Sequence, residues 1–265
     1  MVGRIHSGGT NMTNPKVHSY VILHYGLDYL PYAIQSIYNY VDVINIFYTD
    51  KPSHGYGTNI LPPETKEKLQ QAAFLHNPDK KIKWFDYQGI LQEGVQRDTA
   101  VAVCKSQGAD IVLVVDSDEV WDGLTLDLAI RKVWESNSAR NWLINFTHLW
   151  RSFNWCCKDE GWPVRLLDLR HIDGTEYIPR EYGEIYHFGY AVTDAIMRYK
   201  WQIHGHKGEL RPNWFETKWD AWPPPEDCHP TNEKGFWNPE LFDRGRLPKI
   251  MQSHPFWGLG MERIE

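Results

Sequence analysis

Two kinds of segment alternate along the first half of the chain. Short runs rich in apolar and aromatic residues, each followed by polar or glycine-rich residues, occupy positions 17–24, 43–50, 81–87 and 110–116. Between them, apolar residues recur every three or four positions in segments 29–41, 64–75 and 91–108. The short runs predict strands, and the three- to four-residue spacing predicts helices.

The regular alternation of strand and helix predicts an α/β fold with a Rossmann-like, mostly parallel sheet flanked by helices. The run 110–116 is apolar almost throughout, which indicates a strand covered on both faces. The same patterns predict two further helices and one or two strands, in segments 124–136, 193–205 and 141–155. From Trp214 onward, tryptophan and proline are frequent, which predicts a C-terminal extension that wraps around the domain.

Composition narrows the class of protein. The chain has 265 residues, 42% of them hydrophobic, which is enough for one large domain with a real core. Its formal net charge of −6 argues against a protein that binds nucleic acid through a broad basic face. No apolar run approaches the roughly 20 residues of a membrane span, and the N-terminus lacks the apolar core of a secretory signal. We therefore expect a cytoplasmic protein.

Cysteine and tryptophan add two observations. The 4 cysteines form no CxxC pair, so reduced thiols are expected. A zinc cluster of Cys228 and His229 with Cys156 or Cys157 is the alternative, although it lacks the usual paired spacing. The 13 tryptophans far exceed ordinary usage; most should be core residues, and exposed ones would suit sugar rings or nucleobases.

Polar side chains follow three of the predicted strands. His24 and Tyr25, Asp50, and the triplet Asp116-Ser117-Asp118 each stand where a strand ends. Because the carboxyl ends of parallel strands share one edge of a sheet, these residues should meet there. Two carboxylates so close together repel unless a cation lies between them, and hard oxygen ligands suit Mg²⁺ or Mn²⁺. A solvated acidic turn is the alternative interpretation.

Residues 17–125 resemble the GT-A type of nucleotide-sugar glycosyltransferase, a family-two-like member with a DxD motif at Asp116-Ser117-Asp118. The matching pieces are YVILHYGLDYLPYAIQSI, the strand that ends at Asp50, and EGVQRDTAVAVCKSQGADIVLVVDSDE. A looser match lies in YHFGYAVTDAIMRYKWQIHGH. The resemblance implies a GT-A fold, a nucleoside-diphosphate sugar as donor, and Mn²⁺ or Mg²⁺ as cofactor.

The resemblance also implies roles for individual residues. Asp50 would hold the nucleoside, and Arg97 the base or diphosphate, although Asp98 follows Arg97 where the family usually has Asn. Asp116 would face the ribose and the water shell of the metal, and Asp118 would bind the metal directly. The third metal ligand would be His187, with His204 and His206 as rivals. An imidazole ligand favours Mn²⁺ over Mg²⁺.

Further residues are assigned to the donor and to catalysis. Tyr25, Lys200 and Lys207 are candidates for substrate binding, the two lysines by neutralising the departing diphosphate. An inverting reaction needs a carboxylate to take the acceptor's proton, for which Glu184 and Asp194 are candidates and Glu209 a further rival. A retaining reaction would remove this need.

The acceptor and the rival classes remain open. A saccharide or glycoconjugate hydroxyl is the expected acceptor. Modified nucleic acid is the alternative, because dispersed arginines could line an anionic groove, namely Arg140, Arg151, Arg165, Arg170 and Arg180. A nucleotidyltransferase would carry a basic glycine-rich loop after the first strand, which HYGLDYLP lacks. A non-catalytic sugar- or nucleic-acid-binding module would not need Asp50, Arg97 and Asp118 in this order.

The chain is expected to divide into three parts. Residues 1–16 would be a flexible leader, and residues 17–125 the nucleotide-sugar-binding half. Residues 126–265 would form the acceptor-binding half and the C-terminal wrap of the same domain.

Overall fold

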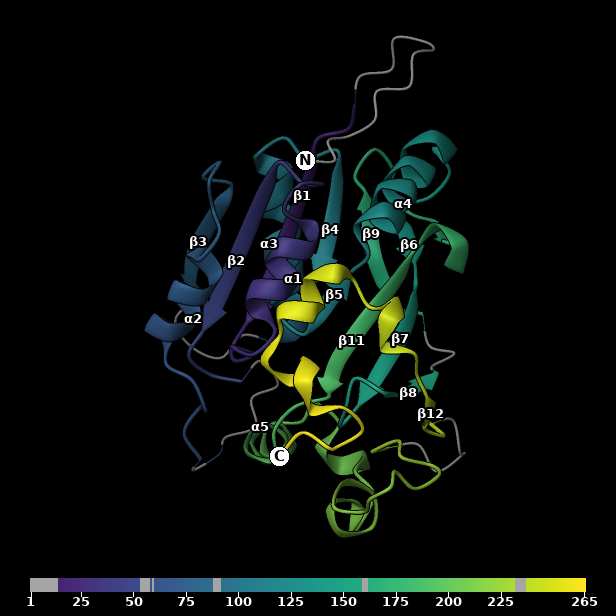
Figure 1. The fold of residues 1–265 in the computed structure, drawn as a ribbon. Helices are drawn as coiled ribbons and strands as arrows, with labels where there is room; N and C mark the ends of the chain where they lie inside the picture. Colours follow the sequence, from purple (N-terminus) through teal and green to yellow (C-terminus); the bar gives the residue numbers. More distant parts are fainter. Residues whose placement is uncertain (1–13, 53–57, 59, 88–91, 159–161, 232–236) are drawn as a thin grey trace.

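The fold is built around two β-sheets (Figure 1). The computed structural model describes residues 14–52, 58, 60–87, 92–158, 162–231 and 237–265. Within these residues, the first sheet has seven strands in the order β10-β6-β9-β4-β1-β2-β3, and the second has five in the order β12-β8-β7-β11-β5.

The strands of the first sheet are β1 (Val17–Leu23), β2 (Val43–Thr49), β3 (Ile82–Tyr87), β4 (Ile111–Val115), β6 (Asn141–Leu143), β9 (Val164–Asp168) and β10 (Thr175–Tyr177). Those of the second are β5 (Glu119–Trp121), β7 (Asn145–Trp150), β8 (Trp155–Lys158), β11 (Glu184–Tyr190) and β12 (Glu240–Leu241). The α-helices of the described residues are α1 (Leu30–Ile37), α2 (Lys66–Phe74), α3 (Glu93–Ser106), α4 (Gly123–Ser136) and α5 (Asp194–Gln202).

The centre of the first sheet is parallel. β1 pairs in parallel with both β2 and β4, and β2 with β3, whereas β9 runs antiparallel to β4 and β6. Each of these four parallel strands lies within a segment predicted from the sequence, and α1 to α3 lie in the segments predicted between them. The mixed α/β fold class, with its mostly parallel sheet, is therefore confirmed.

Helices cover both faces of the sheet. On one face, α1, α2 and α4 bury Leu30, Leu69 and Leu126 in a core that includes Val21 of β1. On the other face, Ala100 and Cys104 of α3 pack with side chains of β1, β2 and β4. As a result, all five residues of β4 are buried. This matches the interpretation of its continuous apolar run as a strand covered on both sides.

The second sheet carries the aromatic core. Trp150, Trp214, Trp219 and Trp237 are buried together with Tyr190 in one cluster on this sheet. The C-terminal segment (yellow in Figure 1) contacts α1, and its residues Met251 and Ile264 are buried in the same cluster. The tryptophan-rich second half is thus mainly a packed core, as expected for most of these residues.

The expected division of the chain into three parts is only partly covered by the described residues. Residues 1–13 of the expected leader fall outside the described residues, and the three-part division stays a prediction. Within the described part of the chain, no helix is long and apolar enough to cross a membrane.

Candidate functional site

A cleft of about 360 Å³ opens at the carboxyl ends of β1, β2 and β4, where the sequence predicts convergence. It has two sides, which are named here the first and the second wall. The first wall consists of the ends of β1 and β4 and the start of α3, and the second of β11, α5 and the residues after α5. The predicted residues that line the cleft are Tyr25, Arg97, Asp116, Asp118, His187, Lys200, His204 and His206.

Gly26 allows the ends of β1 and β4 to approach each other closely. The two strands are parallel neighbours, with Val21 paired to Val115. Gly26 has a φ of +120°, and a Cβ there would lie 2.4 Å from Ser117 Oγ. The Ser117 hydroxyl in turn donates a hydrogen bond to the Tyr25 carbonyl at 3.1 Å. A larger residue at position 26 would therefore be strained and would push the acidic triplet out of place.

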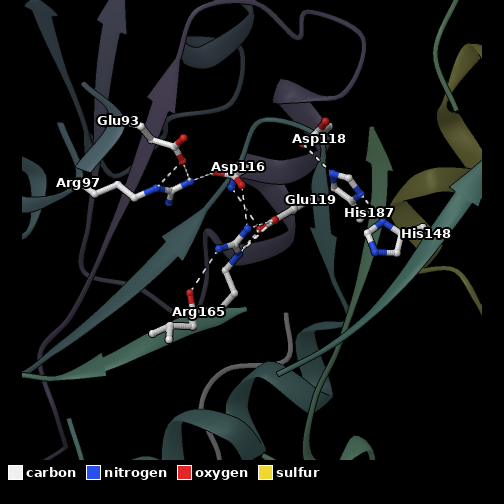
Figure 2. A network of polar contacts seen from close by, with 9 residues as sticks. Glu93, Arg97, Asp116, Asp118, Glu119, His148, Arg165 and His187 are labelled. Carbon is white, nitrogen blue, oxygen red and sulfur yellow. Dashed lines mark hydrogen bonds and ion pairs between the residues drawn. The ribbon is translucent and has the colours of Figure 1, made fainter. Parts of the chain in front are cut away.

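Asp116 lies in a network of charged side chains (Figure 2). Its carboxylate is 2.8 Å from Arg165 and 3.5 Å from Arg97. Arg97 also pairs with Glu93 at 2.7 Å, and the buried Arg165 pairs with Glu119 at 2.5 Å. Burial opposes ionisation of Asp116, but the two guanidinium groups outweigh it and hold the pKa of Asp116 below its ordinary value. The protein itself therefore compensates this charge.

Asp118 has a different environment. Its Oδ1 lies 3.6 Å from Nε2 of His187 on the second wall. Burial raises the pKa of Asp118, and burial lowers the pKa of the His187 imidazole well below its ordinary value. A neutral imidazole has a lone pair that a metal ion can use.

Lys200 lies beside His187 on the second wall, and both side chains pack against Gly189, which has no side chain of its own. The Lys200 ammonium donates a hydrogen bond to the Gly189 carbonyl at 3.1 Å. A Cβ on Gly189 would lie 2.7 Å from both His187 Nε2 and Lys200 Nζ. The absence of a side chain at this position thus allows a lysine and a histidine to reach the same part of the cleft.

The Asp118–His187 pair fits a divalent cation. A separation of 3.6 Å is too long for a hydrogen bond, but it suits two ligands that are each about 2.1 Å from one ion. Among the described residues, no group of three His, Cys, Asp or Glu side chains could hold a metal ion. Mg²⁺ and similar ions commonly take one or two protein ligands and complete their shell with water and substrate phosphates. The donor set is therefore compatible with an ion bound together with a phosphate ligand.

The rival histidines and two substrate-binding candidates lie nearer the rim. His204 and His206 line the cleft after α5, and His206 pairs with Glu209 at 3.3 Å. Lys207 is exposed, donates a hydrogen bond to the Gln202 carbonyl, and is not part of the lining. Asp50 is exposed directly after β2, where its neighbour Thr49 belongs to the cleft.

Neither predicted catalytic carboxylate lies in the cleft. Glu184 starts β11, three residues before His187 and so about 10 Å along the strand, and it pairs with Arg180 at 2.6 Å. Asp194 pairs with the buried Arg151 at 2.6 Å and accepts a hydrogen bond from Trp219. Both carboxylates are paired with arginines outside the lining of the cleft, and their role as proton acceptors stays a prediction. Thr193, not Asp194, caps α5.

Asp28 is a carboxylate of the cleft that sequence reasoning missed. It precedes α1 and lines the cleft, and it makes no ion pair or side-chain hydrogen bond with any residue that the structure describes. Burial raises its pKa. Glu64, also in the cleft, instead accepts weak hydrogen bonds at 3.3 Å from the amides of Gly26 and Leu27.

The dispersed arginines on which the nucleic-acid alternative depends are mostly paired. Four of the five arginines are paired with acidic residues: Arg151 with Asp194, Arg165 with Asp116 and Glu119, Arg170 with Asp168, and Arg180 with Glu184. Arg140 donates to the His171 carbonyl. Four of the five guanidinium groups are therefore charge-compensated within the protein. The alternative zinc cluster at Cys228 and His229 is likewise not formed by the described residues.

No protein-family model and no curated protein matches the chain. The similar solved structures include S. aureus TarS, with 19% identity, a TM-score of 0.34, and coverage of 51% of this chain and 22% of that one. Glucosyl-3-phosphoglycerate synthase from Mycobacterium tuberculosis, in complex with Mn²⁺, UDP and phosphoglyceric acid, has 12% identity and a TM-score of 0.35, covering 51% and 43%. GalNAc-T7 with UDP, GalNAc and Mn²⁺ has 9% identity and a TM-score of 0.43, covering 67% and 44%.

With TM-scores below 0.5, these similarities do not by themselves establish the GT-A fold for this chain. The aligned part spans less than half of each of these three chains. At such identities and TM-scores the similarity does not assign an activity. The chain's mixed α/β architecture, with a mostly parallel sheet flanked by helices, is established by its own sheet topology.

Proposed function

We propose that the protein is a metal-dependent glycosyltransferase that moves a sugar from a nucleoside-diphosphate sugar to a hydroxyl acceptor. The observation that carries the proposal is the Asp118–His187 pair, which lies in one cleft with Arg97 and Lys200. Acidic and imidazole ligands for a cation, placed beside two cationic side chains, suit a ligand that brings phosphate groups to the metal.

The residues of the first wall would bind and orient the donor. Arg97 supplies a guanidinium at the cleft surface, and Asp116, held between Arg97 and Arg165, would face the ribose. Tyr25, which lines the cleft, and Asp50, which is exposed directly after β2, would contact the nucleoside. Because the Asp116 carboxylate is already oriented by arginines, it needs little rearrangement when the donor binds.

Asp118, which follows β4, and His187 and Lys200 of the second wall would act at the sugar–phosphate bond. Asp118 and His187 would hold Mn²⁺, or less favourably Mg²⁺, which when bound supplies Lewis-acid stabilisation of the departing diphosphate. The Lys200 ammonium would neutralise part of the same charge. The mechanism that we propose is inverting, and Asp28 would take the proton from the acceptor hydroxyl, because it is a carboxylate of the cleft that no described cation holds.

A saccharide or glycoconjugate remains the proposed acceptor. The pairing of four of the five dispersed arginines weakens the case for a nucleic-acid acceptor, because paired arginines present no basic surface to a phosphate backbone.

The proposal is tested by measuring Mn²⁺-dependent binding of a panel of nucleoside diphosphates, and hydrolysis of the corresponding sugar donors, for wild type and Asp118→Ala. We expect the variant to lose metal-dependent binding by at least about 100-fold while its melting temperature is retained. Asp79→Ala, which changes an exposed acid outside the cleft, is the matched control and should bind as wild type does.

Two outcomes would contradict the proposal. Unchanged Mn²⁺-dependent binding in Asp118→Ala would remove the metal assignment. A wild-type protein that binds sugars without Mn²⁺, and that turns over no donor of the panel, would instead be the non-catalytic binding module.

A further inference from the structure

His148 lies next to the proposed metal ligand His187. The two residues are register partners on the parallel neighbours β7 and β11, so their side chains project from the same face of the second sheet. Their Nδ1 atoms are 2.7 Å apart and their rings are nearly perpendicular, at 89°. Figure 2 shows His187 lying between Asp118 and His148.

The short distance between the two Nδ1 atoms requires that one carries a proton and the other accepts it. If His187 offers the lone pair of Nε2 to a cation beside Asp118, its proton must reside on Nδ1. His187 Nδ1–H is then the donor, His148 Nδ1 is the acceptor, and the proton of His148 resides on its own Nε2. One hydrogen bond thus connects the tautomers of both rings to metal binding.

The surroundings of His148 hold its ring in place. The ring is buried and packs against Trp237, with ring centroids 4.6 Å apart, and it meets Phe146 edge to face at 5.4 Å. Phe146 also stacks on His187, at 5.4 Å and an angle of 14°. Because aromatic rings support both imidazoles, neither can turn freely away from the hydrogen bond that joins them.

We propose that His148 is a positioning residue, which accepts a hydrogen bond from the Nδ1–H group of His187 and thereby directs His187 Nε2 towards a divalent cation shared with Asp118. The inference rests on the proposed function, since it concerns the same metal site. His148 itself does not touch the cation. Hydrogen bonds of this kind orient metal-binding histidines, and their loss typically lowers metal affinity 10- to 100-fold.

The test measures the affinity for Mn²⁺ alone, from the EPR signal of the free ion during titration, for wild type and three variants at position 148. His148→Phe keeps a ring to pack on Trp237 but removes the acceptor, and we expect Mn²⁺ to bind about 10- to 100-fold more weakly. His148→Gln keeps an acceptor and should recover most of the affinity. If thermal melts show that His148→Phe does not fold because its ring is too large, His148→Leu is measured in its place.

A double-mutant cycle separates positioning from a general structural effect. If His148 acts through His187, then His148→Phe should cause no further loss of Mn²⁺ affinity in a protein that already carries His187→Ala. His229→Phe is the matched control, because His229 packs on Trp237 at 4.6 Å and belongs to neither the cleft lining nor the His187 contacts. This variant should bind Mn²⁺ as wild type does.

The outcomes distinguish the inference from the function on which it rests. A wild type that binds Mn²⁺, together with a folded His148→Phe or His148→Leu of equal affinity, overturns the role of His148 and leaves the proposed function standing. If His148→Phe lowers Mn²⁺ affinity as much in the His187→Ala protein as in wild type, the role of His148 is likewise overturned and the proposed function stands. A wild type that binds no Mn²⁺, alone or with a nucleoside diphosphate, overturns both.

Discussion

The two walls of the cleft differ in how far arginine and lysine side chains compensate the nearby carboxylate. On the first wall, Asp116 is enclosed by Arg97 and Arg165, so its charge is compensated by the protein. On the second wall, His187 and Lys200 surround the space in front of Asp118, and no ion pair shorter than 4.0 Å joins Asp118 to a lysine or arginine of the described residues. Two carboxylates that are nearly adjacent in sequence therefore have different roles. Asp116 is oriented by two arginines of the protein, whereas under the proposed function Asp118 would be compensated by the cation that it binds.

The largest expected effect concerns Asp28, which neither wall neutralises. If it accepts the proton of the acceptor hydroxyl, Asp28→Asn should slow sugar transfer by about 10²- to 10⁴-fold. Binding of the nucleoside diphosphate with Mn²⁺ should change little, because Asn keeps the size of the side chain. Single-turnover transfer assays and calorimetric binding measure the two quantities separately. Normal transfer by this variant would point to a retaining mechanism and remove the assignment of Asp28.

Arg165→Met removes the arginine that pairs with Asp116 and Glu119. It leaves the fully buried Glu119 without its cationic partner, and loss of one member of a buried pair costs about 3–5 kcal/mol of the free energy of unfolding. Urea denaturation measures this loss. Arg97→Gln is the comparison, because the Arg97–Glu93 pair is partly exposed and should contribute at most about 1 kcal/mol. Equal destabilisation by the two substitutions would show that burial does not distinguish these arginines.

His254 connects the C-terminal segment to the loop at the cleft. Its buried ring stacks on Tyr29 at 4.7 Å, and Nε2 donates to the Asp28 carbonyl at 3.0 Å. Burial lowers the pKa of His254 from 6.5 to about 4. The unfolded chain therefore binds this proton more readily, and the stability from His254 is complete above pH 6.5 and is lost as the pH falls towards 4.

This shift predicts a loss of about 2 kcal/mol at pH 5 relative to pH 7. The free energy of unfolding of wild type should fall by that amount relative to that of His254→Phe over this interval, since the phenylalanine ring stacks but does not titrate. Denaturation at the two pH values measures both. A constant difference between the two proteins would mean that His254 does not lose its proton on folding.

Gly189→Ala crowds the second wall alone. The added Cβ would lie 2.7 Å from both His187 Nε2 and Lys200 Nζ, so one of these groups must move. We expect Mn²⁺-dependent nucleotide binding to weaken about tenfold, which is about 1.4 kcal/mol. The Arg165 network lies on the other wall and should be unaffected. Calorimetry gives the affinity, and wild-type affinity in this variant would show that the two side chains can shift without consequence.

The secondary-structure elements that depend on local periodicity could be predicted from the sequence. The four parallel strands, the helices between them and the meeting of Tyr25 with Asp116 and Asp118 all follow from apolar patterns and from the geometry of parallel sheets. The contact of Asp118 with His187 depends on β5 and β11 pairing in the second sheet, which no local pattern specifies. Its prediction came from the family resemblance.

Pairings between distant charged residues could not be predicted. Arg165 reaches Asp116 across 49 positions of sequence, and Glu184 and Asp194 are held by the distant Arg246 and Arg151. One signal was available for Arg165, a charged residue inside the apolar stretch VRLL, because a strand that buries arginine needs an acidic partner. For Glu184 and Asp194, only the folded arrangement reveals that their charges are already used.

The distribution of tryptophan has a practical consequence for spectroscopy. Although the chain has 13 tryptophans, none lines the cleft, and the buried ones pack mainly within the second half. Intrinsic emission should therefore follow the melting of that half and respond little when a ligand enters the cleft. A fluorescent nucleotide or a label near the rim would be the better reporter of binding.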